Sequence, residues 1–180
     1  TIQSFKYCFK KKFGIETDLQ VTKDNKFICF HDFNLKRKFK LNVNVKDINY
    51  SKLKKISNKS RTPIPLLKDL LKISNNKHHL ILEIKPLLNN QNLKNLANLT
   101  KKTEKIRLFS FKEKNLVNLY KLNKRLSLGL LLLSNSNVKI IKSKSKKIYI
   151  KFFGLEKSFL SNKNLTKIKK PIFYYTIKKK

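Results

Sequence analysis

The chain of 180 residues is poor in acidic residues, glycine and cysteine, and it contains no methionine or tryptophan. Its three glycines form no Gly-rich loop of the kind that binds a dinucleotide phosphate. Two cysteines, Cys8 and Cys29, exclude a disulfide framework, and we expect both to be buried as small apolar residues. No apolar run reaches the length of about 20 residues that a transmembrane helix needs, which excludes a transmembrane segment.

Acidic residues are the scarcest charged type, with ten Asp and Glu against 44 Lys and Arg and a formal net charge of +34. A surface this basic suits nucleic acid, because cations neutralise phosphates. Lysine greatly outnumbers arginine, however, while Asn, Ile, Leu and Phe are abundant and Ala is scarce. An AT-rich coding sequence produces that bias without selection for binding, so both explanations of the charge stay open.

Hydrophobic residues make up 40% of the chain, which is enough for a buried core and excludes a disordered tail. The length suits one domain that covers residues 1–180. Without a disulfide pattern, we expect a cytoplasmic location.

A segment of alternating residues follows Gly14. Residues 15–21 read IETDLQV, with apolar side chains at every second position. This period of two predicts a β-strand with one apolar and one polar face. Glu16 and Asp18 therefore lie on the same face, one pleat apart. Two carboxylates this close repel each other unless a cation lies between them, and oxygen ligands suit Mg²⁺ or Ca²⁺.

Two further predicted strands carry titratable groups. Residues 27–30 are apolar and lead into His31, while residues 80–85 read LILEIK. The alternation in the second of these puts Glu83 and Lys85 on one face, toward the barrel interior, and Leu82 and Ile84 on the other.

Predicted strands alternate with predicted helices along the chain, which indicates parallel βαβ units and favours a barrel over a dinucleotide-binding fold. We expect Gly14 to end the first helix and Asp47 to cap the second. Further strands are expected at residues 106–109, 126–132, 148–152 and 172–177. Helices are expected at residues 1–13, 47–56, 66–73, 92–102, 113–122, 138–143 and 164–169, with a basic loop at residues 34–44.

Five short motifs, in this order, resemble the glycerophosphodiester phosphodiesterase family. They read GIETDLQVTKD at residues 14–24, HD at 31–32, IPLLKDLL at 64–71, LEIK at 82–85 and FSF at 109–111. One such motif is weak evidence, but several in order and at sensible spacings are specific. The resemblance extends over nearly the whole chain, to a late strand near Tyr175.

The resemblance implies the (β/α)₈ TIM barrel of phospholipase C-like phosphodiesterases, α/β in class. It also implies that the barrel is incomplete at both ends. The family's His-Arg-Gly segment, with a second catalytic histidine and a phosphate-binding arginine, would precede Thr1, and the last strand would follow the chain. We therefore expect these 180 residues alone to be weakly active or inactive and a longer parent to be active.

The reaction that the resemblance implies is metal-dependent hydrolysis of a glycerophosphodiester, a small-molecule substrate, to glycerol 3-phosphate and an alcohol. Glu16, Asp18 and Glu83 match the family's metal ligands, for Mg²⁺ or Ca²⁺. His31 matches a catalytic histidine that exchanges a proton with the attacking or leaving oxygen. Lys85 matches the lysine that holds a phosphate oxygen.

Two aromatic positions complete the implied site. Phe111 and Tyr175 match residues that wall the glycerol pocket, although Tyr175 stands where the family commonly has a tryptophan. Each functional assignment has a plain structural alternative: strand carboxylates paired with the abundant lysines, and His31 as an ordinary polar residue. The motif context favours function over these alternatives. Asp32 is expected to be a strand-end residue, and His78 and His79 are expected to be solvated in a turn.

Two other functions stay open from the sequence. The same barrel supports phospholipase D-like enzymes that act on lysophospholipid or sphingolipid headgroups. The charge of +34 is also compatible with a non-enzymatic RNA-binding protein of the organellar ribosomal type. The placement of scarce acids in the family motifs favours the phosphodiesterase over RNA binding.

Overall fold

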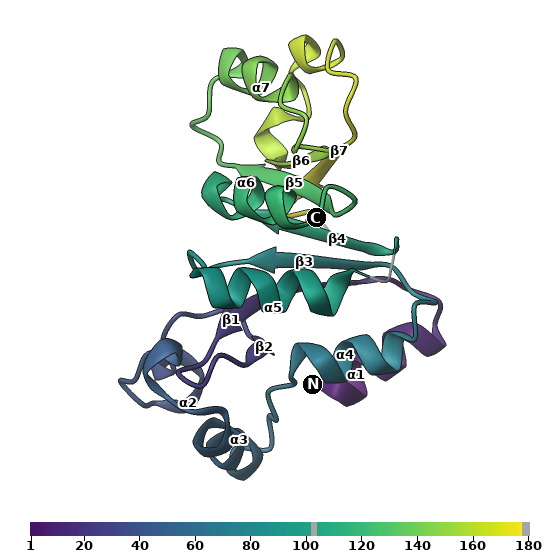
Figure 1. The fold of residues 1–180 in the computed structure, drawn as a ribbon. Helices are drawn as coiled ribbons and strands as arrows, with labels where there is room; N and C mark the ends of the chain where they lie inside the picture. Colours follow the sequence, from purple (N-terminus) through teal and green to yellow (C-terminus); the bar gives the residue numbers. More distant parts are fainter. Residues whose placement is uncertain (102–103, 178–180) are drawn as a thin grey trace.

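The computed structural model describes residues 1–101 and 104–177, which form one curved β-sheet with helices packed against its outer face (Figure 1). The strands are β1 (Ile15–Val21), β2 (Phe27–Cys29), β3 (Leu80–Ile84), β4 (Ile106–Ser110), β5 (Ser127–Leu132), β6 (Phe152–Glu156) and β7 (Ile172–Tyr175). The helices are α1 (Ile2–Lys10), α2 (Lys36–Phe39), α3 (Tyr50–Lys59), α4 (Leu67–Ser74), α5 (Asn90–Thr100), α6 (Glu113–Leu122) and α7 (Val138–Ser145).

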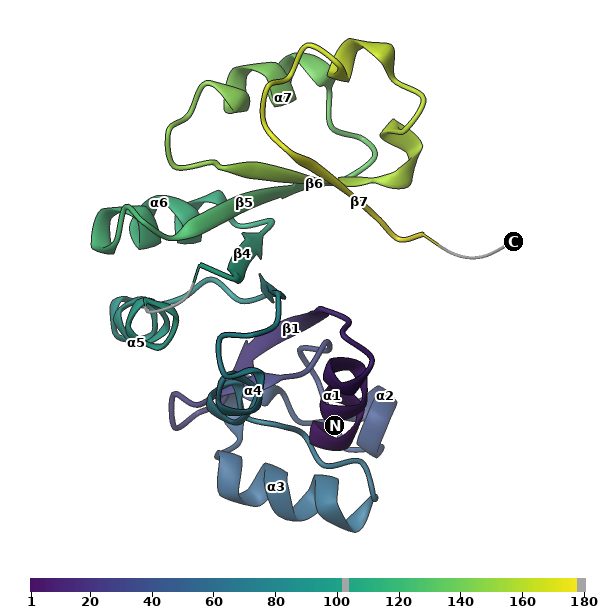
Figure 2. The same cartoon turned by 90° about the vertical axis from the view of Figure 1, so that its right-hand side faces the viewer.

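The strand order is β2-β1-β3-β4-β5-β6-β7, in which β2 is antiparallel to β1 and the other neighbours are parallel. Parallel strands joined by helices confirm the predicted α/β barrel architecture. Figure 2 shows the chain passing from the α1 and α3 end of the sheet to the α7 and β7 end. Within the part of the chain that the structure describes, β1 and β7 do not pair with each other, so the barrel is incomplete.

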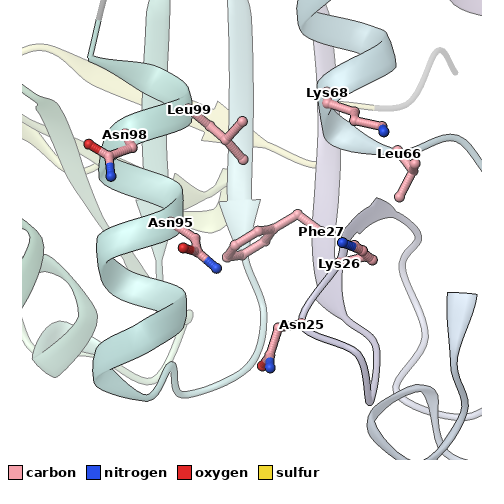
Figure 3. A pocket seen from close by; sticks show the side chains of 8 residues that line it. All are labelled: Asn25, Lys26, Phe27, Leu66, Lys68, Asn95, Asn98 and Leu99. Atoms are coloured by element: carbon pink, nitrogen blue, oxygen red, sulfur yellow. The ribbon is translucent and has the colours of Figure 1, made fainter.

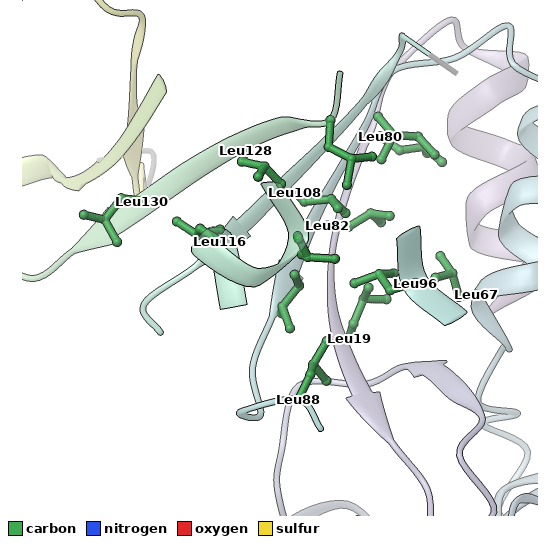
Figure 4. Packing of buried hydrophobic residues seen from close by; sticks show 14 of the residues in the cluster. Leu19, Leu67, Leu80, Leu82, Leu88, Leu96, Leu108, Leu116, Leu128 and Leu130 are labelled. Atoms are coloured by element: carbon green, nitrogen blue, oxygen red, sulfur yellow. The ribbon is translucent and has the colours of Figure 1, made fainter. Parts of the chain in front are cut away.

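The outer face of the sheet is the main hydrophobic core. Strand leucines point toward leucines of the covering helices (Figure 4). Leu19, Leu82 and Leu108 are fully or almost fully buried there against helix residues such as Leu96 and Leu116. Burying one such side chain contributes about 1.5–3 kcal/mol, so this face supplies most of the hydrophobic stabilisation. Ile15 and Leu19 of β1 and Leu82 and Ile84 of β3 face outward as the alternation predicts, whereas Ile81 packs on the inner face.

The inner face of the sheet holds a smaller cluster of Phe109, Leu131 and Phe152. The Phe109 and Phe152 rings meet edge to face, with their centroids 4.6 Å apart. A Cβ atom at Gly129 would lie 2.0 Å from the Phe152 ring, so only glycine leaves room for it. Two of the three glycines, Gly129 and Gly154, thus lie where inner side chains cross neighbouring strands.

The sixth strand differs from its prediction. A strand was expected at residues 148–152, but β6 begins at Phe152. The apolar run before it is a loop in which Ile150 packs into the main core and the Tyr149 hydroxyl donates to Glu113. The register of β6 on β5 is Gly129 opposite Phe152, so side-chain complementarity across the sheet decides where the strand lies.

Helix ends differ from prediction where distant residues supply the contacts. Gly14 does not end α1, because Lys12 already adopts the left-handed conformation with φ of 61°. Asp47 does not cap α3; the carboxylate of Asp24 accepts from the Tyr50 amide at 2.9 Å instead. The expected end of α5 at Lys102 lies outside the described residues.

The segment expected as a basic loop at residues 34–44 contains the short helix α2. An expected helix at residues 164–169 is a single 3-10 turn, Lys163–Leu165. Cys29 is buried as predicted, and burial raises the pKa of its thiol to about 12, whereas Cys8 is only half-buried. Among the described helices, each is too short or too polar to cross a bilayer.

Candidate active site

Three carboxylates meet at the inner face of β1 and β3. Glu16, Asp18 and Glu83 each offer an oxygen, and these oxygens lie within 4.8 Å of one another. The cause is the period of two along each strand, combined with the parallel register that sets Asp18 opposite Glu83. In barrel enzymes, side chains that follow the carboxyl ends of such strands build the catalytic site.

Lys85 follows β3 and lies between two of these carboxylates. Its Nζ is 3.2 Å from Glu83 Oε1 and 3.5 Å from Asp18 Oδ1. The backbone amide of Lys85 donates to the Leu19 carbonyl, which ties the end of β3 to β1. One ammonium group therefore offsets part of the negative charge of the cluster.

The remaining negative charge alters the carboxylates' affinity for protons. Partial desolvation, then Asp18 and Glu83, raise the pKa of Glu16 to about 7, although its side chain stays accessible to solvent. Burial also raises the pKa of Glu83, although Lys85 opposes the shift. A group of acids that holds a proton near neutral pH is a group that a cation would stabilise. The donor set consists of carboxylate oxygens only, which fits a hard divalent cation such as Mg²⁺ or Ca²⁺.

His31 lies two residues after the end of β2 and borders the same pocket. Two hydrogen bonds hold its backbone: the Phe30 amide donates to the Asp18 carbonyl at 2.9 Å, and the buried Gln20 side chain donates to the His31 carbonyl at 3.2 Å. The ring is 62% exposed, and its Nδ1 lies 2.7 Å from Asp32 Oδ1. A solvent-accessible imidazole at this position can exchange protons with a bound ligand.

The pocket has a volume of about 580 Å³ and is polar on one side and apolar on the other. The carboxylates, Lys85 and His31 line one side, and Phe109, Phe111 and Tyr175 line the other. The Phe111 and Tyr175 rings meet edge to face with centroids 6.2 Å apart. Every sequence-predicted site residue thus lines one pocket, while the individual roles stay predictions.

Tyr175 is fixed on the apolar side by its hydroxyl, which donates to the Leu132 carbonyl at 2.8 Å. Burial, followed by the nearby Glu83 and Glu156, raises the pKa of Tyr175 to about 12. The phenol is therefore neutral at physiological pH and acts as an aromatic wall with a fixed orientation.

Sequence reasoning missed part of the pocket. Phe173, Thr176 and Ile177 also line it, and alternation along the last strand was the available signal for Phe173. Asp32 was interpreted as a strand-end residue, but it bonds both His31 and Arg37. The available signal was an arginine five positions after the acid, in a segment that otherwise uses lysine.

A second pocket lies outside the sheet, between the β1–β2 hairpin, the start of α4 and α5 (Figure 3). Its volume is about 310 Å³, and its lining combines amides, lysines and apolar side chains without a carboxylate or histidine. The lining residues are Asn25, Lys26, Phe27, Leu66, Lys68, Asn95, Asn98 and Leu99. This lining therefore lacks the carboxylate cluster and the histidine that the first pocket provides.

The other two histidines lie away from the pocket. His78 stacks on Phe9 with ring centroids 4.1 Å apart, so it is less solvated than the sequence suggested. His79 is exposed, and its Nδ1 lies 3.4 Å from Arg107.

Comparison with known proteins finds a matching family and solved structures of similar fold. The family model described as "Glycerophosphoryl diester phosphodiesterase family" matches residues 1–173. The structure is similar to glycerophosphodiester phosphodiesterase from Thermotoga maritima, with 21% identity and a TM-score of 0.82 over 99% of this chain and 80% of that chain. A search of curated proteins gave no significant match.

Two further solved structures share the fold. One is an Oleispira antarctica phosphodiesterase in complex with the product sn-glycerol-3-phosphate, with 19% identity and a TM-score of 0.82 over 99% of this chain and 79% of that chain. The other is a glycerophosphodiester phosphodiesterase from Parabacteroides distasonis, with 18% identity and a TM-score of 0.76 over 99% of this chain and 77% of that chain.

Proposed function

Because this chain belongs to the glycerophosphoryl diester phosphodiesterase family, we propose that it hydrolyses glycerophosphodiesters to glycerol 3-phosphate and an alcohol, with a divalent cation as cofactor. The observation that carries this proposal is the cluster of Glu16, Asp18 and Glu83 beside Lys85 and His31 in one pocket. Such a pocket combines cation ligands, a phosphate-binding cation and a proton-transfer group, which are the parts that diester hydrolysis requires.

We assign the three carboxylates as ligands of Mg²⁺ or Ca²⁺. The bound cation would neutralise the anionic diester and orient its phosphate. With a raised pKa, Glu16 has to release its proton before it serves as a ligand. The choice between the two cations follows from ligand number and site rigidity, and a titration with each cation decides it.

Lys85 and His31 act on the substrate itself in this proposal. Lys85 binds a non-bridging phosphate oxygen, since its ammonium group lies within ion-pair distance of two carboxylates that the cation would engage. His31 exchanges a proton with the attacking or leaving oxygen, an effect worth roughly 10²–10⁴ in rate. Phe111 and Tyr175 pack against the glycerol carbons and exclude water from that side.

The first test is release of glycerol 3-phosphate from glycerophosphocholine by the longer parent protein, which we expect to be active, measured with Mg²⁺, with Ca²⁺ and with EDTA. Glu16→Gln and His31→Ala should each lower kcat/KM at least about a hundredfold, because they remove a cation ligand and a proton-transfer group. Glu104→Gln, at an exposed carboxylate outside the pocket, is the matched control and should retain activity. Absence of metal-dependent turnover on several glycerophosphodiesters would contradict the proposal.

Lysophospholipid and sphingomyelin are tested as substrates in the same assay. Their hydrolysis without hydrolysis of glycerophosphocholine would indicate phospholipase D-like activity instead. Salt-dependent RNA binding without hydrolysis would favour the RNA-binding alternative instead. We also propose a cytoplasmic location, since both cysteines are free.

A further inference from the structure

A chain of three polar side chains leads away from the pocket, from His31 through Asp32 to Arg37. Asp32 Oδ1 is 2.7 Å from His31 Nδ1 and 2.9 Å from Arg37 Nη2, and Arg37 Nε donates to Asp32 Oδ2 at 2.7 Å. We propose that Asp32, held by Arg37, is a positioning residue that fixes His31 in the tautomer with a protonated Nδ1 and a free Nε2. This assignment rests on the proposed function, in which His31 exchanges a proton with the substrate.

The hydrogen-bond inventory sets the direction of each bond. A guanidinium group is always charged in proteins and only donates, so both oxygens of Asp32 act as acceptors toward Arg37. Hydrogen bonds from Arg37 lower the pKa of Asp32, which keeps it ionised, and the His31 contact acts in the same direction. An ionised carboxylate has no proton to donate, so His31 Nδ1 is the donor. The neutral ring then carries its lone pair on Nε2, the nitrogen that is left for proton exchange with substrate.

Burial is uneven along the chain. The Asp32 side chain is 15% exposed, although its partners His31 and Arg37 are 62% and 72% exposed. Contacts to a covered carboxylate are less screened than those between two exposed side chains. A bidentate arginine–carboxylate pair also fixes orientation in a way that a single contact does not. Asp32 is therefore the fixed member, and it limits how far the exposed imidazole can rotate.

The backbone around Arg37 is anchored although its side chain is exposed. Leu35 precedes α2 and is fully buried in a core cluster with Ile28 and Val45. Its amide donates to the Val43 carbonyl at 2.9 Å, and the amide of the next residue, Lys36, donates to Asn34 Oδ1 at 2.7 Å. These contacts hold α2 beside β2, so the guanidinium group is presented by an ordered turn.

The residue type at position 37 agrees with this role. Arg37 is one of only four arginines in a chain dominated by lysine, and it lies between Lys36 and Lys38. Lysine would supply the charge but not the two parallel N–H donors that match a carboxylate. The geometry therefore uses a property that only arginine offers.

The direct test is ¹⁵N NMR of the imidazole rings, which distinguishes the two neutral tautomers without any need for turnover. The chain has three histidines, so His78→Gln and His79→Gln assign the His31 signals. Wild-type protein should show a protonated Nδ1. In Asp32→Asn, the side-chain amide can donate to Nδ1, so we expect the population to move toward the Nε2-protonated tautomer. An unchanged tautomer in folded Asp32→Asn overturns the proposal.

Kinetics give the second readout. Asp32→Asn should lower kcat about 10–100-fold, the range for residues that orient a catalytic or ligating histidine, with KM changed less than about twofold. Arg37→Lys keeps the charge and should cause a smaller loss of kcat with a partial change of tautomer. Lys38→Ala on the same helix is the matched control and should match wild type. Equal losses in Lys38→Ala and Arg37→Lys contradict a specific role of Arg37.

Circular dichroism and thermal unfolding establish that each variant folds, and Arg37→Lys tests the chain of contacts if Asp32→Asn does not fold. The two proposals fail in different experiments. A protonated Nδ1 together with absence of diesterase turnover in the longer wild-type parent supports the positioning by Asp32 and overturns the proposed function. Turnover that is unaffected in folded Asp32→Asn supports the function and overturns the positioning.

Discussion

The inner face of the sheet has two halves of opposite chemistry. On β1 and β3 it carries Glu16, Asp18 and Glu83, whereas on β4–β6 it carries Phe109, Leu131 and Phe152. Both halves arise from the same alternation of side chains along parallel strands. The polar half brings like charges together at a cost in stability, and the apolar half is packed tightly. The same strand geometry therefore builds the candidate site on β1 and β3 and a packed apolar support beside it on β4–β6.

The largest effect is expected from a cavity in the apolar half. Leu131→Ala removes a buried side chain that packs with Phe109 and Phe152, and it should lower the free energy of unfolding by about 2–5 kcal/mol. Urea unfolding measures this loss. Leu133→Ala, at a side chain that is 54% exposed, is the matched control and should change stability little. Metal affinity of folded Leu131→Ala should match wild type; a large fall would mean that the halves are not independent.

A steric conflict in the same apolar half should lower the free energy of unfolding somewhat less than the Leu131→Ala cavity does. Gly129→Ala places a Cβ atom 2.0 Å from the Phe152 ring, and overpacking of this kind typically costs about 1–3 kcal/mol. The double variant Gly129→Ala with Phe152→Leu should recover part of the loss, because the smaller side chain leaves room. A double-mutant cycle of unfolding free energies measures this coupling. Strict additivity of the two changes would refute the packing explanation.

The polar half should respond to pH where the apolar half does not. Since the pKa of Glu16 is about 7, protons compete with the cation below that pH, and ionised Glu16 is favoured above it. Affinity for Mg²⁺ or Ca²⁺ should therefore fall by up to about tenfold, or about 1.4 kcal/mol, for each pH unit below 7. Calorimetric titration at pH 5.5, 6.5 and 7.5 measures the slope. Glu16→Gln should bind the cation more weakly, and its affinity should depend less on pH. A cation affinity of the wild type that does not change with pH would argue against a raised pKa of Glu16.

The smallest effect on stability is expected at the edge strand β7, which follows the apolar half in the sheet. Tyr175→Phe removes the hydrogen bond to the Leu132 carbonyl, which should cost about 0.5–1.5 kcal/mol. Tyr174→Phe, on the opposite face of β7 against the outer core, is the matched control. In thermal unfolding, the melting temperature of Tyr175→Phe should be lower than that of Tyr174→Phe. The reverse ranking would show that the Tyr175 hydroxyl does not stabilise the wall.

The alternation of side chains made much of the polar half predictable. Glu16, Asp18, Glu83 and Lys85 were placed on inner strand faces from the sequence, because a period of two assigns each residue to a face. The site of β6 was not predictable in this way. Its position depends on Phe152 finding the space over Gly129, which is a contact between strands and not a property of either segment.

Contacts between distant segments also explain the other differences. The cap of α3 comes from Asp24, 26 residues before Tyr50, so local sequence favoured the nearer Asp47. The segment at residues 34–44 contains a helix because Leu35 is buried against residues from other segments. The role inferred for Asp32 depends on that helix, which is why the sequence alone indicated only a strand-end residue. Local sequence patterns were enough to predict which strand residues share a face. The helix cap and the loop conformations could not be predicted, because they depend on contacts between distant segments.

The rate at which the Cys29 thiol is alkylated would report on opening of β2, the strand that ends two residues before His31. The thiol is buried in β2, and burial raises its pKa to about 12, so very little of the reactive thiolate forms at pH 8 while the fold is closed. An alkylating reagent would therefore label Cys29 almost only while β2 is detached from the sheet. The labelling rate would therefore measure how often β2 opens. A lower rate after addition of Mg²⁺ or Ca²⁺ would show that a bound cation stabilises the segment that leads to His31.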